Sequence, residues 1–336
     1  MIMNRNIASD AGIEISKILG AGLVGRGKIF YAAKAASDWA AEMQPKIDKD
    51  YFFNSSTAVQ DAVYATKDKR GDVVIVGPGK MQESVIVGSR TAGSNKAGVK
   101  IIAAVHGWET QVRMGDAATK NGAYTPTGGT AAGGFGFLVL SRSVEITGFL
   151  LDGGGGYSGI YVGDGYSALS SSWDENSASA WIHGNSFRGG TEGIYGMVLD
   201  GCSSDVRVTD NLFEQQTIAG IYITPGGSRT VQRPLIARND FVDSAGYGID
   251  MYSSATTTGV LMRENSFSDG VSTTMTAGIR TLGAGVHSIV GNYFACAVPM
   301  LAVATDFVSG NFYGWAGSTA AATNKYVTEA NAGAEA

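Results

Sequence analysis

Short apolar runs alternate with Gly, Asn and Ser turns throughout the second half of the chain. Brief segments such as Val206-Arg-Val208 and Gly220-Ile-Tyr222 recur there, and nothing in residues 180–313 sustains the 3.6-residue apolar period of an amphipathic helix over three turns. Two or three short strands per repeat, joined by turn residues, are typical of one coil of a parallel β-helix. The pattern therefore predicts a solenoid of stacked strands.

The clearest element of the repeat is the tripeptide Asn-x-Phe. Five copies are separated by 26, 28, 26 and 27 residues, and a degenerate copy, Asn311-Phe-Tyr313, follows. Repeats of this length cannot bury a core alone and must stack on their neighbours. Coils about 4.8 Å apart would place equivalent residues above one another, which predicts a buried aromatic stack and a ladder of amides that tolerate left-handed corners. These scaffold residues are Asn185, Phe187, Asn211, Phe213, Asn239, Phe241, Asn265, Phe267, Asn292 and Phe294.

A second repeated element is Gly-Ile followed by a variable residue. Because side chains alternate along a strand, we expect the Ile to lie inside and the next residue to point outward. This outward column consists of Tyr161, Tyr195, Tyr222, Asp250 and Arg280. Stacked tyrosines beside an Asp and an Arg suit either a subunit interface, such as a trimer contact, or the binding of sugar rings. An exposed aromatic ladder that only stabilises the sheet remains the third alternative.

The pattern divides the chain into four parts. Residues 1–36 form an N-terminal anchoring arm, 37–70 two short helices, 71–313 the solenoid and 314–336 a C-terminal tail. The arm is rich in Gly and too weakly apolar to fold alone, so we expect it to become ordered against a partner. Its anchoring positions are Ile7, Ile13, Ile15 and Ile18.

The two helices carry recognisable end signals. Ser37 is the expected N-cap of the first, and Thr57 with Gln60 matches a capping box at the start of the second. Lys67, Lys69 and Arg70 suit the C-terminal end of the second helix dipole. An open first coil would expose its core and a strand edge, so we expect this helix to cap the solenoid.

Two stretches resemble known families. The second helix, then Gly71-Asp-Val-Val-Ile-Val-Gly-Pro-Gly79 and Glu83-Ser-Val-Ile-Val87, resemble the entry to pectate-lyase-like β-helices, as do the repeats, over residues 55–313. The arm segment Ile7-Ala-Ser-Asp-Ala-Gly-Ile-Glu-Ile-Ser-Lys-Ile18 is similar to segments of bacteriophage virion and tail-fibre proteins. The resemblances imply an all-β fold, a right-handed single-stranded parallel β-helix, and a place in a phage particle, by analogy as a homotrimer.

Composition and charge narrow the partners. Gly is 48 of 336 residues and charged residues are 16%, which suits turn-rich packed structure. A net charge of −5 without a basic run argues against a nucleic-acid partner, and the absence of an 18-residue apolar run argues against a membrane span. The N-terminus lacks the pattern of a secretory signal, and two cysteines 94 residues apart form no framework. We therefore expect a virion protein assembled in the host cytoplasm.

The catalytic signatures of the β-helix enzymes do not transfer to this chain. It contains no Asn-x-Asp, Asp-Asp or Gly-His-Gly, its only Arg-x-Lys (Arg26-Gly-Lys28) lies in the arm, and His106, His183 and His287 are isolated in sequence. No catalytic residue, metal or cofactor is therefore predicted. Tailspike glycosidases need only two carboxylates and no signature, so the acidic residues on neighbouring coils keep an enzyme open. They are Asp200, Asp205, Asp210, Glu214, Asp240, Asp243, Asp250, Glu264 and Asp269.

Together these patterns predict a structural phage protein, a capsid decoration or small spike attached to the capsid or tail through its arm. The alternative is a tailspike or receptor-binding protein that binds or cleaves host surface polysaccharide.

Overall fold

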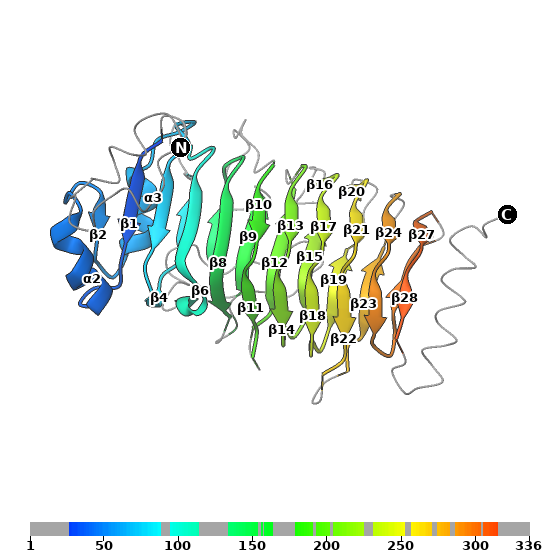
Figure 1. Cartoon of the computed structure of the whole chain (residues 1–336). Helices are drawn as coiled ribbons and strands as arrows, with labels where there is room; N and C mark the ends of the chain where they lie inside the picture. The colour runs from blue at the N-terminus through cyan, green and yellow to red at the C-terminus, as the bar shows by residue number, and fades with distance from the viewer. Residues whose placement is uncertain are drawn as a thin grey trace, which may run out of the picture.

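The chain winds into a solenoid whose strand pairings, in the part that the structure describes, are all parallel. The computed structural model describes residues 27–88, 95–113, 134–153, 156, 158–163, 179–190, 193–201, 204–224, 231–252, 257–270, 274–282, 286–303 and 305–314. Coils stack along one axis from β1 to β28, with the helices at the N-terminal end (Figure 1). The predicted right-handed parallel β-helix is confirmed. Within the described residues, no helix is both long and apolar enough to cross a membrane.

The coils build one separate eight-stranded sheet and a larger bent sheet with two faces. The eight-stranded sheet contains β5 (Val85–Val87), β7 (Phe135–Val139), β9 (Ser158–Gly163), β12 (Tyr195–Asp200), β15 (Ala219–Thr224), β19 (Tyr247–Met251), β23 (Ala277–Thr281) and β26 (Met300–Leu301). A short ladder of β16 (Val231–Gln232) and β20 (Thr257–Thr258) lies apart from both.

The bent sheet is held together by two long strands, β6 (Lys100–Arg113) and β8 (Glu145–Asp152). The start of β8 pairs with β10 and its end pairs with β11, so one strand belongs to both faces. The β10 face continues through β10 (Trp181–His183), β13 (Arg207–Thr209), β17 (Leu235–Ala237), β21 (Leu261–Arg263), β24 (Ser288–Val290) and β27 (Phe307–Ser309). The β11 face continues through β11 (Ser186–Arg188), β14 (Leu212–Glu214), β18 (Asp240–Val242), β22 (Ser266–Ser268), β25 (Tyr293–Ala295) and β28 (Phe312–Tyr313).

The predicted aromatic stack runs through the interior. Successive rings from Phe187 to Phe294 lie 4.5–4.9 Å apart with interplanar angles of 4–10°, and Tyr313 adds a last ring at 5.8 Å. The five phenylalanines are buried. Each phenylalanine ring also packs against a glycine of the facing strand and fills the space that a Cβ atom would take there. These glycines are Gly159, Gly196, Gly220, Gly248 and Gly278. An added Cβ there would meet the ring within 3.0 Å, so the stack requires glycine opposite it.

The predicted asparagine ladder is confirmed at the corner before the β11 face. In the middle of the ladder, Asn239 Nδ2 donates to Asn265 Oδ1 at 3.0 Å and to two backbone carbonyls. Asn239 Oδ1 in turn accepts from Asn211 Nδ2 at 2.9 Å. We expected the Asn to adopt the left-handed conformation at each corner. The structure instead places the residue before the Asn in that conformation. Those residues are Gly184, Asp210, Arg238, Glu264, Gly291 and Gly310, all with φ of 55–66°.

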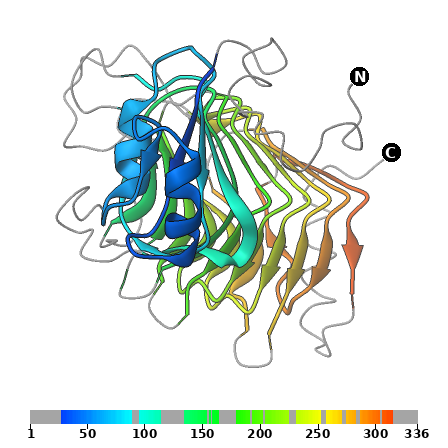
Figure 2. The same ribbon diagram turned by 60° about the vertical axis from the view of Figure 1, so that its left-hand side comes forward.

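Two helices close the N-terminal end, in front of the coils in Figure 2. In α2 (Asp38–Met43) Ser37 is the N-cap, as predicted, and accepts from Ala40 N at 3.1 Å. In α3 (Ala58–Ala65) the expected capping box is wrong, because Thr57 makes no side-chain cap bond. The buried Glu83 carboxylate instead accepts the backbone N–H groups of Val59 and Gln60, at 3.2 and 3.0 Å. A residue 23 positions away in sequence thus supplies the cap.

The side chain of Gln60 meets a strand instead of its own helix. Its Nε2 donates to Ile86 O at 3.1 Å and its Oε1 accepts from Ile86 N at 2.7 Å. The amide therefore satisfies both backbone groups of one residue on β5, the first strand of the eight-stranded sheet. Gln60 thus joins α3 to the end of the solenoid where the sequence predicts a cap, through a contact that local sequence does not reveal.

The cation at the end of α3 also differs from the prediction. The helix has no basic residue in its last turn, and Arg70 pairs with Asp72. Lys96 Nζ, from a distant loop, donates to Tyr64 O at 2.9 Å and to Thr66 O at 2.6 Å. Burial lowers the pKa of Lys96, and the negative charges of Asp72 and Asp68 partly oppose that shift.

The start of the solenoid lies earlier than residue 71. Strand β1 (Ile29–Ala32) pairs in register with β3 (Val73–Val76) and also with the short β2 (Phe52–Phe53). A further strand, β4 (Gly79–Gln82), pairs with β6, and a 3₁₀ turn covers Gln44–Lys46. Residues 29–32, predicted to belong to the arm, therefore form part of the sheet, and the four anchoring isoleucines lie outside the described residues.

Candidate functional site

The predicted outward column is buried, which corrects its reading as an exposed interface. Tyr161, Tyr222 and Asp250 are at most 1% exposed. Their side chains do leave the solenoid interior, but they join a second apolar cluster outside it, against which Ile86, Ile194, Ile218, Tyr247 and Tyr252 pack. Alternation along the strand thus gave the correct direction, whereas burial depends on neighbouring residues that alternation does not describe. Only Arg280 of the column is partly exposed.

The column also contains one wrong member. Tyr161 aligns with Val198, and Val198 with Tyr222, Asp250 and Arg280 on successive strands. Tyr195 instead aligns with Ala219 and Tyr247. The repeated glycine of this coil is therefore Gly196, which meets Phe213, and the Gly193-Ile-Tyr195 match is three residues out of register.

Two carboxylates anchor this outer cluster. Arg280 holds Asp250 in a bidentate pair at 2.7 Å, and its guanidinium lies 4.0 Å from the ring centre of Tyr247. Tyr161 Oη donates to Asp200 Oδ2 at 2.6 Å. Burial raises the pKa of Asp200 to about 7. Burial also raises the pKa of Asp250, although Arg280 opposes the shift. These contacts join neighbouring coils and stabilise the outer cluster.

Most of the remaining acidic candidates are also held by protein groups. Arg233 and Arg238 form bidentate pairs with Asp205 and Asp210, at 2.9 and 2.8 Å, on successive coils. Both aspartates have a lowered pKa, for which the arginine hydrogen bond is the main cause. Asp269 accepts the backbone N–H groups of Met275 and Ala297. Asp243 accepts from Gln215. These partners suit a scaffold better than a free pair of catalytic carboxylates.

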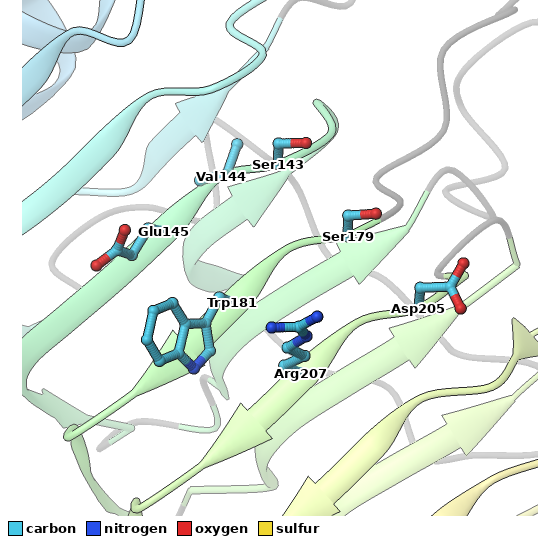
Figure 3. A pocket seen from close by; sticks show the side chains of 7 residues that line it. All are labelled: Ser143, Val144, Glu145, Ser179, Trp181, Asp205 and Arg207. Carbon is cyan, nitrogen blue, oxygen red and sulfur yellow. The ribbon is translucent and has the colours of Figure 1, made fainter. Parts of the chain in front are cut away.

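The best candidate for a site is a hollow on the β10 face that the sequence did not indicate. It has a volume of about 290 Å³ and opens on the outside of β8, β10 and β13 (Figure 3). Its lining residues are Ser143, Val144, Glu145, Ser179, Trp181, Asp205 and Arg207. Register explains the gathering, because Glu145, Trp181 and Arg207 are direct neighbours on three adjacent strands.

The indole of Trp181 is the main apolar surface of the hollow and is fixed in place. The residue is 39% exposed, its ring stacks on His183 at a centroid distance of 4.0 Å, and its Nε1 donates to Thr209 Oγ1 at 3.1 Å. His183 Nε2 lies 3.2 Å from Glu145 Oε1, so this histidine, isolated in sequence, has an acidic neighbour in space. A half-exposed tryptophan with both its ring plane and its polar atom held is ready for a flat ligand.

Charges of both signs surround the indole. Burial raises the pKa of Glu145, but hydrogen bonds from Lys100 and His183 outweigh it, so the pKa lies below its usual value. Lys100 Nζ is 2.7 Å from Glu145 Oε2. On the other side, the exposed side chain of Arg207 makes no hydrogen bond or ion pair with the described residues, although its charge helps to lower the pKa of Asp205, which is already held by Arg233. The hollow therefore offers one uncommitted guanidinium beside an aromatic surface.

Sequence reasoning missed this site because its column does not repeat. The positions equivalent to Trp181 are Glu145, Arg207, Leu235, Leu261, Ser288 and Phe307, so no period draws attention to them. The only indication in the sequence was a tryptophan, Trp181, at a position where the other copies of the repeat have none.

Comparison with known proteins gives one family match. Residues 83–325, well over half of the chain, match the family described as periplasmic copper-binding protein (NosD). No curated protein matches the sequence.

Several solved structures resemble the chain at low sequence identity. ORF18 of Geobacillus virus E2 is 13% identical with a TM-score of 0.50, covering 77% of this chain and 54% of the viral chain. Pectin methylesterase PemA from Erwinia chrysanthemi is 8% identical with a TM-score of 0.41, covering 94% and 99%. The Dettilon tailspike protein gp208 is 13% identical with a TM-score of 0.31, covering 80% and 59%.

The chain spans about half the length of the viral ORF18 protein. At such identities a structural likeness shows the fold alone, whereas the family match extends over most of the solenoid. The chain belongs to the NosD family.

Proposed function

We propose that this chain is a structural protein of a bacteriophage particle, a rigid β-helical decoration or small spike attached through its N-terminal arm. The observation that carries the proposal is the unbroken internal ladder. From Asn185 to Asn311 each side-chain amide bonds to the next coil, and a stack of aromatic rings runs beside it. Coils tied in this way from β11 to β28 resist bending, as a part that holds a fixed position between the particle and its surroundings must do.

Two further observations support a phage setting. The segment from Ile7 to Ile18 is similar to segments of phage virion and tail-fibre proteins. The fold is also shared with ORF18 of Geobacillus virus E2. Function in this proposal is mechanical. The arm binds a capsid or tail protein, the solenoid projects, and its outer faces meet solvent or the host.

The arm supplies the test. The full chain, a variant lacking residues 1–26, and a full-length variant with Ile7, Ile13, Ile15 and Ile18 changed to Ser should each be mixed with purified phage capsids and with purified tails. Deletion up to residue 26 leaves β1 intact, so the solenoid keeps its first pairings. Co-sedimentation measures binding, and sedimentation velocity measures whether the free protein is a trimer.

We expect only the unaltered chain to bind. Binding to capsids supports a decoration protein, and binding to tails supports a spike. If the full chain binds neither particle, or if both arm variants bind as well as the full chain, the proposal fails.

Copper binding, which the family name suggests, is a second candidate that the described residues do not fit. They contain no group of three or more His, Cys, Asp or Glu side chains placed to hold a metal ion. His183 lies against Glu145 and His287 is buried several coils away. The thiol of Cys296 is buried, which raises its pKa to about 12 and disfavours the thiolate that would bind a metal. We therefore assign no role to copper.

A further inference from the structure

We propose that the hollow beside Trp181 binds one pyranose unit of an acidic saccharide, with the sugar ring on the indole and its anionic group on Arg207. The inference rests on the geometry of the β10 face and stands apart from the proposed place in a virion. A binding experiment with the isolated protein can therefore fail without affecting the particle-binding test, and the reverse also holds.

Ring stacking is the first element of the site. The C–H groups of a pyranose form a flat apolar patch, which packs against the electron-rich face of an indole. Trp181 is already oriented by His183 and Thr209, so little ordering of the side chain is needed on binding. An isolated exposed aromatic residue would lack this support. Phe307, in the same column on the last coil, is 54% exposed and does not line this hollow.

Size limits the ligand to one ring. The volume of about 290 Å³ is near the lower end of ligand pockets, about 300 Å³, and suits a single sugar unit better than a buried chain. The hollow lies on the open surface of the coils, so the rest of an oligosaccharide can extend across neighbouring strands.

Charge selects an acidic sugar. Among the charged groups that line the hollow, Glu145 is bonded to Lys100 and Asp205 is bonded to Arg233, whereas Arg207 has no such partner among the described residues. A guanidinium binds a carboxylate through two parallel N–H donors. The exposed hydroxyls of Ser143 and Ser179, which line the same hollow, are suited to sugar hydroxyl groups.

A nucleobase could also stack on Trp181, but the rest of the chain disfavours it. The net charge of −5 repels an acidic saccharide as well as a phosphate backbone, but the single guanidinium of the hollow suits one carboxylate, whereas nucleic-acid binding needs several cations along the backbone. A short oligonucleotide nevertheless belongs in the test as the competing class.

The test is calorimetric titration of the full chain with three probes: a β-1,4-linked mannuronic acid hexamer, the neutral mannohexaose of the same backbone, and the oligonucleotide dT6. We expect the acidic hexamer to bind with a Kd of about 1 mM or tighter, the neutral hexamer at least about threefold more weakly, and dT6 more weakly still. The preference for the acidic hexamer should shrink as salt is added.

Two variants separate the ring from the charge. Trp181→Ala should weaken both hexamers about tenfold or more. Arg207→Gln should weaken only the acidic hexamer, about threefold to tenfold, to the level of the neutral one. Phe307→Ala, an exposed aromatic residue in the same column, should bind like the wild type. Thermal melting of each variant checks folding, and Arg207→Gln remains informative if Trp181→Ala is unstable because Arg207 is exposed.

Three outcomes would overturn the inference. They are no binding of either hexamer at about 10 mM, unchanged affinity in a folded Trp181→Ala variant, or tighter binding of dT6 than of the acidic hexamer. The last of these would indicate a nucleic-acid site instead.

Discussion

Equivalent positions on successive coils carry identical residues inside the solenoid and different residues on its outer face. Inside, Phe213, Phe241 and Phe267 occupy one position on consecutive coils, with the same partners above and below. Outside, on the β10 face, the equivalent of Trp181 is Glu145 on one neighbouring coil and Arg207 on the other. Because coils stack at a fixed spacing, identical side chains stabilise the fold where they contact one another in the packed interior, and this constraint does not apply on the exposed face. The interior therefore specifies the fold, and the outer face is free to carry a specific site.

The largest expected effect comes from interrupting the interior stack. Phe241→Ala removes a buried ring between two stacked neighbours and should lower the free energy of unfolding by about 3–5 kcal/mol. Phe312→Ala is the matched outer change, because Phe312 is 65% exposed, and it should cost less than about 0.5 kcal/mol. Urea unfolding of the two variants measures both values. Equal losses would contradict the distinction between inside and outside.

The buried outer cluster should respond to pH through Asp200. Its pKa in the folded chain is about 7, raised from 3.8, so the folded state holds a proton that the unfolded chain releases at lower pH. Stability should therefore fall as pH rises from about 4 to about 7, because over this range unfolding releases the proton that the buried carboxyl group holds. Asp200→Asn removes this dependence.

The measurement is the free energy of unfolding of wild type and Asp200→Asn at pH 5 and at pH 7. The advantage of the variant should grow by on the order of 2 kcal/mol between the two values. The exposed Asp50→Asn provides the control and should show no comparable change. A constant difference between wild type and Asp200→Asn would contradict the raised pKa.

A smaller loss is expected from a single step of the amide ladder. Asn239→Ala removes a donor to Val208 O and to Asn265, and an acceptor for Asn211, all of them buried. The expected cost is about 2 kcal/mol, since these groups lose partners where water does not replace them. Exposed Asn54→Ala serves as control, and thermal melting compares the two. Similar melting points would show that the ladder adds little to stability.

The smallest effect belongs to an exposed pair at the corners. Asp210 and Arg238 are each 47% exposed, so removing the pair by Arg238→Gln should cost less than about 1 kcal/mol. The loss should diminish at high salt because surrounding ions screen the pair. A double-mutant cycle with Asp210→Asn isolates the interaction. A coupling well above that value, unaffected by salt, would place these corners among the main supports of the fold.

The sequence predicted what repeats and missed what does not. Asn239 and Phe241 could be identified because five successive coils carry Asn-x-Phe at nearly one spacing. Tyr195 was misaligned because Gly193-Ile-Tyr195 matches the Gly-Ile motif, whereas Gly196, the glycine that faces the phenylalanine stack, is followed by Met197.

Contacts between distant segments were hidden for another reason. Glu83 caps a helix that begins more than 20 residues earlier, and a local capping box gave no sign of it. Trp181 became a candidate only when the register placed Glu145 and Arg207 on either side of it. Both cases depend on which strands become neighbours, which no local pattern encodes.

The asparagine ladder has a direction, and this has a consequence for how such a chain can change its length. Each amide donates to the coil that follows, from Asn185 as far as Asn311. A tandem duplication of one unit of 26–28 residues would keep this order and extend the rod by about 4.8 Å. The last step, from Asn292 to Asn311, spans only 19 residues, so a unit of another length also keeps the column if it closes one whole coil and carries the corner Asn. The length of the solenoid can therefore change in evolution only by whole coils, and such a change leaves the contacts within the remaining coils unaltered.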